Sequence, residues 1–460
     1  MSARAIFSVA RAAASLAAAG LALALLGGCA EKGPRPIALI GATILDGRGG
    51  RPLHDGVVLV RGRTIVAVGS REDVPLPRGT TEVDVSGSWI IPGLIDAHAH
   101  TARWALPRYV AYGVTTVRDV HNTQDSVFAM ATAADLGAMI SPRIYAAGAM
   151  LDAAPPTYPN ATVVGTTREA RQAVDRLSVA GVHLIKVYTR ITPGLLEAIT
   201  DEAATFHIPV AAHLGLTDAL TAARFGVASI EHLSGVPEAA GIPDSLYAAH
   251  RRSFFEGWTA FETSWVRLDS TTLTRVAGQL AETHVTMVPT LVLHETFSRL
   301  DDSMLAQNPD LRAMPREELV AWDVPGMVQR AGWTAADFDA FRRGRPNQDL
   351  FVRAFKRAGG RVVTGTDASN QMLVPGASEH TELELLVRAG LTPTEALRAA
   401  TSDAAALLGA DSLGVIAPGK GADLVVLSRD PLADITNSRS ITRVMVRGQL
   451  YLADSIRSHW

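Results

Sequence analysis

Apolar and polar positions alternate in short runs near both ends of the chain, and glycine and proline separate these runs. The runs are Val57–Val60, Thr64–Val68, Glu82–Val85, Ala422–Leu427 and Ile441–Val446. Such alternation, bounded by turn residues, is typical of antiparallel β-structure that is covered on one face. A β region at each end, with a different pattern between them, suggests that the two ends pair into one small domain.

The middle of the chain alternates apolar, β-branched runs with helical stretches such as Arg168–Ala180, Pro193–Phe206 and Thr217–Phe225. The runs are nearly continuously apolar, as in strands buried on both faces. They are Ile90–Ala97, Val114–Val120, Arg143–Ala147, Leu184–Tyr188, Pro209–Ala212, Ala228–Glu231, Val285–Leu291 and Arg361–Thr366. Eight such βα units favour an α/β fold of the (β/α)8 TIM-barrel type.

The alternative fold is an open, doubly wound sheet, but no glycine-rich phosphate-binding fingerprint follows the first strand. The segment Glu295–Leu350 is long and charged. We expect it to be helical and to lie over the mouth of the barrel.

Composition narrows the classes of protein further. The chain has 460 residues, of which 47% are hydrophobic and 19% charged, so it is too apolar for a disordered protein. Its formal net charge is −3, and this lack of basic excess argues against a nucleic-acid partner.

The first residues have the features of a bacterial lipoprotein signal peptide. Arg4 and Arg11 precede an apolar run, Ala12–Leu26, that is too short to span a bilayer comfortably. The following Leu26-Gly27-Gly28-Cys29 resembles a lipobox, in which the cysteine becomes the lipidated N-terminus. Cys29 is the only cysteine, which excludes an intramolecular disulfide and a catalytic thiol elsewhere.

We therefore expect a signal peptide over residues 1–28, a lipid anchor at Cys29 and a tether over residues 29–36. The protein would be held at the cell envelope, on the periplasmic side of the outer membrane if the cell is Gram-negative. An ordinary secretory leader is the alternative.

Polar side chains that can bind metal follow five of the eight apolar strands. In Asp96-Ala97-His98-Ala99-His100 the two imidazoles point to the same side of the strand, because side chains alternate between faces. Lys186 lies inside an apolar strand, where an unpaired ammonium is costly. The remaining strand-end residues are His213, His232 and Asp367. Their shared placement predicts a metal site at the carboxyl ends of the barrel strands.

These segments resemble the amidohydrolase superfamily, most strongly its imidazolonepropionase-like and prolidase-like branch. The resemblance covers roughly residues 37 to 450. The matching motifs are Ile91-Pro92-Gly93-Leu94-Ile95-Asp96-Ala97-His98-Ala99-His100, Gly113-Val114-Thr115-Thr116-Val117-Arg118-Asp119, Ile185-Lys186-Val187-Tyr188, Ser229-Ile230-Glu231-His232 and Thr364-Gly365-Thr366-Asp367.

The resemblance implies a catalytic (β/α)8 barrel over residues 92–411 and a small β-sandwich domain built from residues 37–91 and 412–460. It also implies two divalent metal ions, usually zinc. His98, His100 and Asp367 would hold one ion, and His213 and His232 the other. Lys186 would carry a CO2-derived carbamate that bridges both.

The implied reaction is hydrolysis of an amide, in a dipeptide or an N-acyl amino acid, by a metal-bridging hydroxide. Asp367 would act as the base, and Tyr188 would donate a hydrogen bond to the substrate. For a substrate carboxylate the sequence offers Arg103, His121 and His294 without ranking them, although we favour a solvent-facing His121. Arg118 and Asp119 are expected to form a structural ion pair.

Two alternatives remain open at this stage. One is a cyclic-amide hydrolase or deaminase of the same superfamily, although those branches tend to use one metal and to lack the bridging lysine. The other is a non-catalytic, ligand-binding lipoprotein, which would have no need of Lys186 or Asp367. The sequence also leaves open whether the chain forms homo-oligomers.

Overall fold

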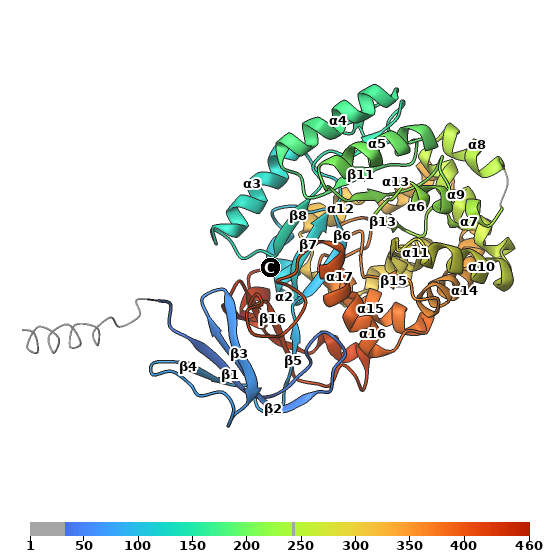
Figure 1. Ribbon diagram of the computed structural model, residues 1–460. Coiled ribbons are helices and arrows are strands. Elements are labelled where there is room, and N and C mark those ends of the chain that lie inside the picture. Colours follow the sequence, from blue (N-terminus) through green and yellow to red (C-terminus); the bar gives the residue numbers. More distant parts are fainter. Residues whose placement is uncertain (1–32, 242–243) are drawn as a thin grey trace, which may run out of the picture.

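The computed structural model describes residues 33–241 and 244–460. The predicted signal peptide and Cys29 lie outside the described residues. Strands from both ends of the chain join in one mixed sheet, which lies beside a larger α/β part (Figure 1). Within the described ranges, no helix has the length and apolar character needed to cross a membrane.

The mixed sheet confirms that the two chain ends pair. Its N-terminal strands are β1 (Ile37–Ile44), β2 (Leu53–Arg61), β3 (Thr64–Ser70), β4 (Thr81–Asp84) and β5 (Trp89–Pro92). Its C-terminal strands are β16 (Leu424–Leu427), β17 (Ile441–Val446) and β18 (Gln449–Leu452). The strand β5 joins the two sets, because it pairs antiparallel with β16 and parallel with β1. The strands form one hydrogen-bonded sheet, so a two-layer sandwich stays a prediction.

The α/β part contains two parallel sheets. One is β6 (Leu94–Ala99), β7 (Val114–Asp119) and β8 (Arg143–Ala146). The other runs in the order β10 (Thr162–Val163), β9 (Leu151–Asp152), β11 (Ile185–Val187), β12 (Val210–Ala212), β13 (Ser229–Glu231), β14 (Thr286–Val288) and β15 (Arg361–Val362). These ladders confirm a parallel α/β fold, but over the described residues they do not form one closed ring of strands.

Helices connect these strands and cover the sheets (Figure 1). Up to β13 they are α2 (Leu106–Ala111), α3 (Gln124–Asp135), α4 (Thr167–Ala180), α5 (Pro193–Thr205) and α6 (Ala219–Arg224). Between β13 and β14 come α7 (Val236–Ala239), α8 (Ser245–Arg252), α9 (Phe254–Ser264), η1 (Trp265–Arg267) and α10 (Ser270–Ala281).

After β14 the chain is again helical, as predicted for Glu295–Leu350. These helices are α11 (Leu291–Phe297), η2 (Ser303–Gln307), η3 (Pro309–Ala313), α12 (Arg316–Ala321), α13 (Val324–Ala331) and α14 (Ala335–Arg357). The remaining helices are α15 (Ala377–Ala389), α16 (Pro393–Ala399), α17 (Ser402–Leu407), η4 (Ile435–Arg439) and α18 (Ala453–Arg457).

Three of the eight predicted barrel strands differ from the structure by more than one residue at an end. The run Ile90–Ala97 is divided by Gly93 into β5 and β6. A Cβ at Gly93 would lie 2.0 Å from Thr115 Oγ1, so only glycine fits where the chain passes from the mixed sheet to the parallel one. Leu291 begins α11 rather than ending a strand, and β15 stops at Val362.

Close backbone contacts lock the two chain ends together. The Ala422 N–H donates to Arg63 O, and the Gly448 N–H donates to Ala422 O, both at 2.9 Å. Gly448 has φ +77°, and a Cβ there would lie 1.7 Å from Gly62 O in the β2–β3 turn. The turn that precedes β18 therefore needs a residue without a side chain.

We predict that Gly448→Ala destabilises the protein more than Gly79→Ala does. Gly79 has a similar φ of +81° but open space around its would-be Cβ, so it controls for backbone strain alone. The excess loss should be about 1–3 kcal/mol, the usual cost of overpacking. Urea unfolding of both variants measures it, and equal losses would show that the two chain ends are not tightly interlocked at this turn.

Candidate active site

The six predicted metal-binding side chains all line one cavity of about 450 Å³. They come from β6, β11 and the segments that directly follow β6, β12, β13 and β15. These residues are His98, His100, Lys186, His213, His232 and Asp367. The six residues, predicted at the ends of parallel strands, therefore do lie together.

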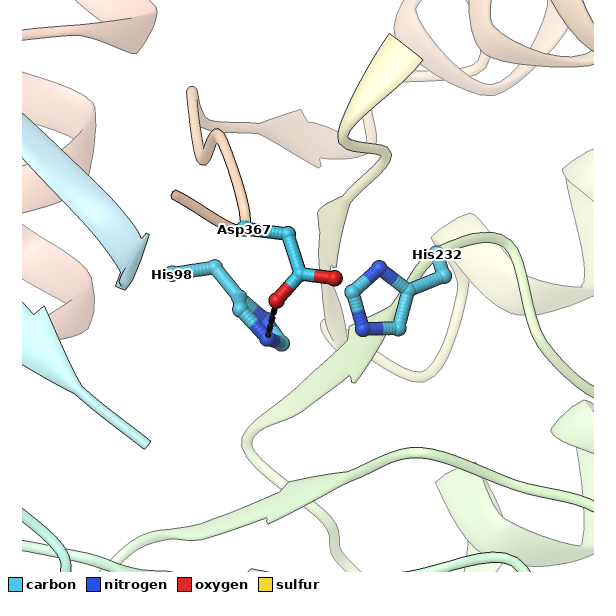
Figure 2. Close-up of side chains that lie close together, drawn as sticks. All are labelled: His98, His232 and Asp367. Atoms are coloured by element: carbon cyan, nitrogen blue, oxygen red, sulfur yellow. Dashed lines mark ion pairs between the residues drawn. The ribbon is translucent and has the colours of Figure 1, made fainter. Parts of the chain in front are cut away.

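Three of these residues form a compact group that could hold a metal ion. The ligand atoms of His98, His232 and Asp367 all lie within 4.8 Å of one another, and the three side chains converge (Figure 2). His98 Nε2 is 3.3 Å from Asp367 Oδ1, and the ring centroids of His98 and His232 are 4.3 Å apart. Two imidazoles and a carboxylate are donors that suit zinc and similar divalent ions.

The other predicted ligands surround this group. His100 Nε2 lies 2.9 Å from Asp367 Oδ1, and the His213 ring is 4.6 Å from that of His232. Lys186 is 1% exposed, and its Nζ has no hydrogen-bond partner among the described residues. The compact group combines ligands from both predicted sets, so the division between two ions stays a prediction.

A buried carboxylate orients His98. The His98 Nδ1–H donates to Glu231 Oε2 at 2.6 Å, so Nε2 is the ring nitrogen that faces Asp367 and the site. Glu231 in turn accepts hydrogen bonds from Arg118 Nη2 at 2.8 and 3.0 Å and from the Ser229 hydroxyl at 2.5 Å. The expected ion pair between Arg118 and Asp119 is wrong, because Arg118 turns toward Glu231.

Asp119 instead fixes the loop after β6. It accepts hydrogen bonds from the Thr101 N–H at 2.8 Å and from Asn122 Nδ2 at 3.0 Å. Adjacent strand residues point to opposite faces, which explains why Arg118 and Asp119 form hydrogen bonds with different residues.

A second buried carboxylate links the strand of His98 to the loop of Asp367. Asp96 accepts hydrogen bonds from the Thr366 hydroxyl at 2.5 Å and from the Thr366 N–H at 3.0 Å. The same carboxylate accepts from the His98 N–H at 3.1 Å. Asp96 thus fixes two distant parts of the chain in one geometry.

Burial and neighbouring charges keep most of these groups in forms that bind metal. Burial lowers the pKa of His213 and of His232 well below the usual value, so both rings are neutral. Burial alone would raise the pKa of Asp367, but His98 and the hydrogen bond from His100 hold it well below its usual value. Burial also lowers the pKa of Lys186 to about 8.

Tyr188 and His121 are pocket residues of different character. Burial raises the pKa of Tyr188 well above its usual value, so its hydroxyl remains a donor. His121 lines the cavity and is buried, which corrects the expectation that it faces solvent. The Met150 N–H donates to His121 Nδ1 at 3.1 Å, so Nε2–H donates to Asn160 Oδ1 at 3.0 Å. Burial lowers the pKa of His121 to about 4, which leaves this ring uncharged.

Two other candidates for substrate contact lie elsewhere. Arg103 is exposed and does not line the cavity. His294 is buried behind the cavity wall, where its Nδ1 is 2.5 Å from Glu262 Oε1 and its Nε2–H donates to His232 O at 3.1 Å. It supports the backbone of a predicted ligand instead of facing the substrate.

Sequence reasoning missed three features of the site. These are the role of Glu231, the cavity-lining Arg330 on α13, and the aromatic residues of α9. Glu231 had a detectable signal, because it is a carboxylate in an apolar strand directly before a predicted ligand. Arg330 and α9 had none, since their position depends on how the helices after β13 and β14 fold back.

Comparison with known proteins identifies the family of this chain. The model of the amidohydrolase family matches residues 89–451. Ochratoxinase from Aspergillus niger is 24% identical, over 91% of this chain and 88% of its own length. Imidazolonepropionase from Deinococcus deserti is 26% identical, over 83% of this chain and 88% of its own length.

Two solved structures share the fold. The bottromycin amidohydrolase superposes with a TM-score of 0.71 at 23% identity, over 93% of this chain and 90% of that one. The structure of A. niger ochratoxinase gives a TM-score of 0.67 at 20% identity, over 92% and 96%. Because the family model spans most of the chain and includes every residue of the candidate site, the protein belongs to the amidohydrolase family and is a hydrolase that acts on C–N bonds.

Proposed function

We propose that the protein is a binuclear metal-dependent hydrolase that cleaves an amide bond in a dipeptide or an N-acyl amino acid. The observation that carries this proposal is the convergence of four histidines, a lysine and an aspartate in one cavity. His98, His232 and Asp367 already form a group of metal-binding size, and His100, His213 and Lys186 supply the further donors that a second ion needs.

Lys186 is the residue that best supports a second ion. A buried amine with no partner is unfavourable unless it has another role. Its pKa of about 8 makes the neutral amine accessible near neutral pH, and a neutral amine can react with CO2. The resulting carbamate is an anionic ligand with two oxygens, which suits a bridge between two divalent ions, zinc in our proposal.

The chain's residues divide the catalytic work. Bound metal ions would supply a water of lowered pKa and would polarise the substrate carbonyl. Asp367 accepts the proton of the attacking water and passes it to the leaving amine. The Tyr188 hydroxyl donates a hydrogen bond to the oxygen on which negative charge develops. Glu231 and Asp96 hold His98 and the Asp367 loop in position throughout.

We also propose that the two parallel sheets are arcs of one (β/α)8 barrel. Backbone hydrogen bonds span both gaps between them. The Ala97 N–H donates to Thr364 O at 3.0 Å, and the His183 N–H donates to Ala146 O at 2.9 Å. The barrel would extend over residues 92–411, and the mixed sheet would fold on itself as the small domain of residues 37–91 and 412–460.

We propose that the substrate carries a free carboxylate on its leaving amino acid. Arg330 is the only arginine among the described residues that line the cavity. It lies at an exposed position and pairs with Asp323 at 2.9 Å, so it is available to exchange this partner for a substrate.

The first prediction concerns Lys186. Lys186→Ala should bind fewer than two zinc ions per chain and lose at least about tenfold in activity, in line with the loss of a ligand or its support. Short carboxylates added to Lys186→Ala should partly restore both the zinc stoichiometry and the activity, because they can occupy the place of the carbamate. Zinc titration measures the stoichiometry. Tight binding of two ions and normal activity in Lys186→Ala would refute the bridge.

The second prediction concerns the substrate carboxylate. Amidating the C-terminus of a good dipeptide substrate should lower kcat/KM about tenfold to a hundredfold, because a charge-assisted hydrogen bond is lost. Arg330→Gln should lower kcat/KM for the acid and leave the amide almost unaffected. Arg343→Gln is the matched control, since Arg343 is equally exposed and pairs with Asp339 at 2.9 Å outside the cavity. Equal cleavage of acid and amide by the wild type would exclude this recognition.

The third prediction concerns Cys29, which we propose is lipidated and anchors the enzyme to an envelope membrane. Several acyl chains on one residue bind a membrane stably, whereas a single chain binds only marginally. Cys29→Ser should move the protein from the membrane fraction to the soluble fraction, as followed by fractionation and immunoblotting. Unchanged retention of Cys29→Ser in the membrane would rule out this anchor.

A further inference from the structure

One flank of the cavity is built almost entirely from apolar and aromatic side chains. These are Tyr158, Tyr188, Phe254, Phe255, Trp258, Leu293, Phe297 and Met327. The cavity lining also includes the polar residues Ser369, Asn370 and Gln371, which follow Asp367. The lining therefore offers both apolar and polar groups beside the predicted ligands, so the cavity is suited to a substrate with one apolar and one polar end.

The helix α9 provides the centre of this apolar flank. It begins directly after Ser253, whose hydroxyl accepts a hydrogen bond from the Glu256 N–H at 3.1 Å. Phe254 and Trp258 are four residues apart and therefore lie on the same face of the helix. Their rings are 6.2 Å apart, and each lies 6.3 Å from the ring of His213.

This flank is fixed from behind. The His294 ring stacks on Trp258 with centroids 5.7 Å apart and planes 8° apart. His294 also contacts the Glu262 carboxylate and the backbone carbonyl of His232. One side chain thus holds both the apolar flank and a predicted metal ligand, so the distance between them is set before substrate arrives.

Two aromatic side chains of this flank are only partly buried by the rest of the protein. Trp258, Leu293 and Phe297 are buried, whereas Phe254 and Phe255 are only partly buried and face the cavity. A substrate group that covers these two rings would remove apolar surface from water on both partners. A small polar substrate would leave the Phe254 and Phe255 rings exposed to water.

We propose that the enzyme selects substrates with a large aromatic or branched apolar side chain beside the scissile amide, and that Phe254 contributes directly to this selection. The proposal rests on the proposed amide hydrolysis and adds the substrate class. The apolar side chain packs on Phe254 and Trp258 near His213, and the polar end of the substrate contacts Arg330 and the polar lining residues Ser369, Asn370 and Gln371.

The test compares dipeptides that carry Phe, Leu, Ala or Gly on either side of the amide, with the zinc-loaded enzyme. In one of the two series, kcat/KM should be about tenfold to a hundredfold higher for Phe or Leu than for Ala, since a larger apolar side chain that fits such a pocket gains at least about tenfold. Phe254→Ala should reduce that ratio at least about fivefold. Phe206→Ala, which removes an exposed ring outside the cavity, should leave it unchanged.

A binding measurement separates this inference from the hydrolytic function. N-acetyl-phenylalanine and N-acetyl-alanine are titrated into metal-free wild type and Phe254→Ala, with thermal unfolding as the check on folding. Cleavage of all dipeptides at similar rates, or equal binding of the two probes, overturns the apolar selection alone. Absence of all cleavage, with N-acetyl-phenylalanine still bound at least about tenfold more tightly and this preference lost in Phe254→Ala, supports the selection and counts against amide hydrolysis.

Discussion

The buried Glu231 carboxylate is the interaction on which the site depends. It lies between the Arg118 guanidinium and the His98 imidazole, and these three residues come from β13, β7 and β6. Burial alone would raise the pKa of Glu231, but the charge of Arg118 and the hydrogen bond from His98 hold it below its usual value. Removing one member would leave an uncompensated buried charge, which is strongly destabilising.

The contacts among Arg118, Glu231 and His98 explain how polar side chains can be buried next to an apolar core. The strands β6, β7 and β11 to β14 are buried along their length. The predicted ligands other than Lys186 lie at or after the ends of their strands. Asp96 extends the same principle, because it ties the His98 strand to the Thr366 loop and so positions Asp367. His98 and Asp367 are therefore positioned by hydrogen bonds that the substrate does not need to provide.

The predicted metal ligands and the residues that would contact the substrate side chain come from different kinds of element. The ligands sit at the ends of short parallel strands, where the backbone is fixed by neighbouring ladders. Phe254, Trp258 and Arg330, which would select the substrate, lie on the helices α9 and α13 between β13 and β15. Such a separation lets the surrounding helices change specificity while the chemical centre keeps its geometry.

Periodicity and residue type predicted the parallel α/β fold and the six polar residues at strand ends that meet in the cavity. These follow from local rules, since a strand buried on both faces must be apolar and its polar groups must appear at its ends. The pairing of both chain ends was only suggested by the pattern and rested on the family resemblance. Only the tertiary structure decided which charged side chains form ion pairs. Arg118 pairs with Glu231 instead of its neighbour Asp119, and His121 turns into the cavity although its position in the sequence suggested solvent. The same holds for Phe254, Trp258 and Arg330, whose places depend on how helices far along the chain fold back over the strand ends.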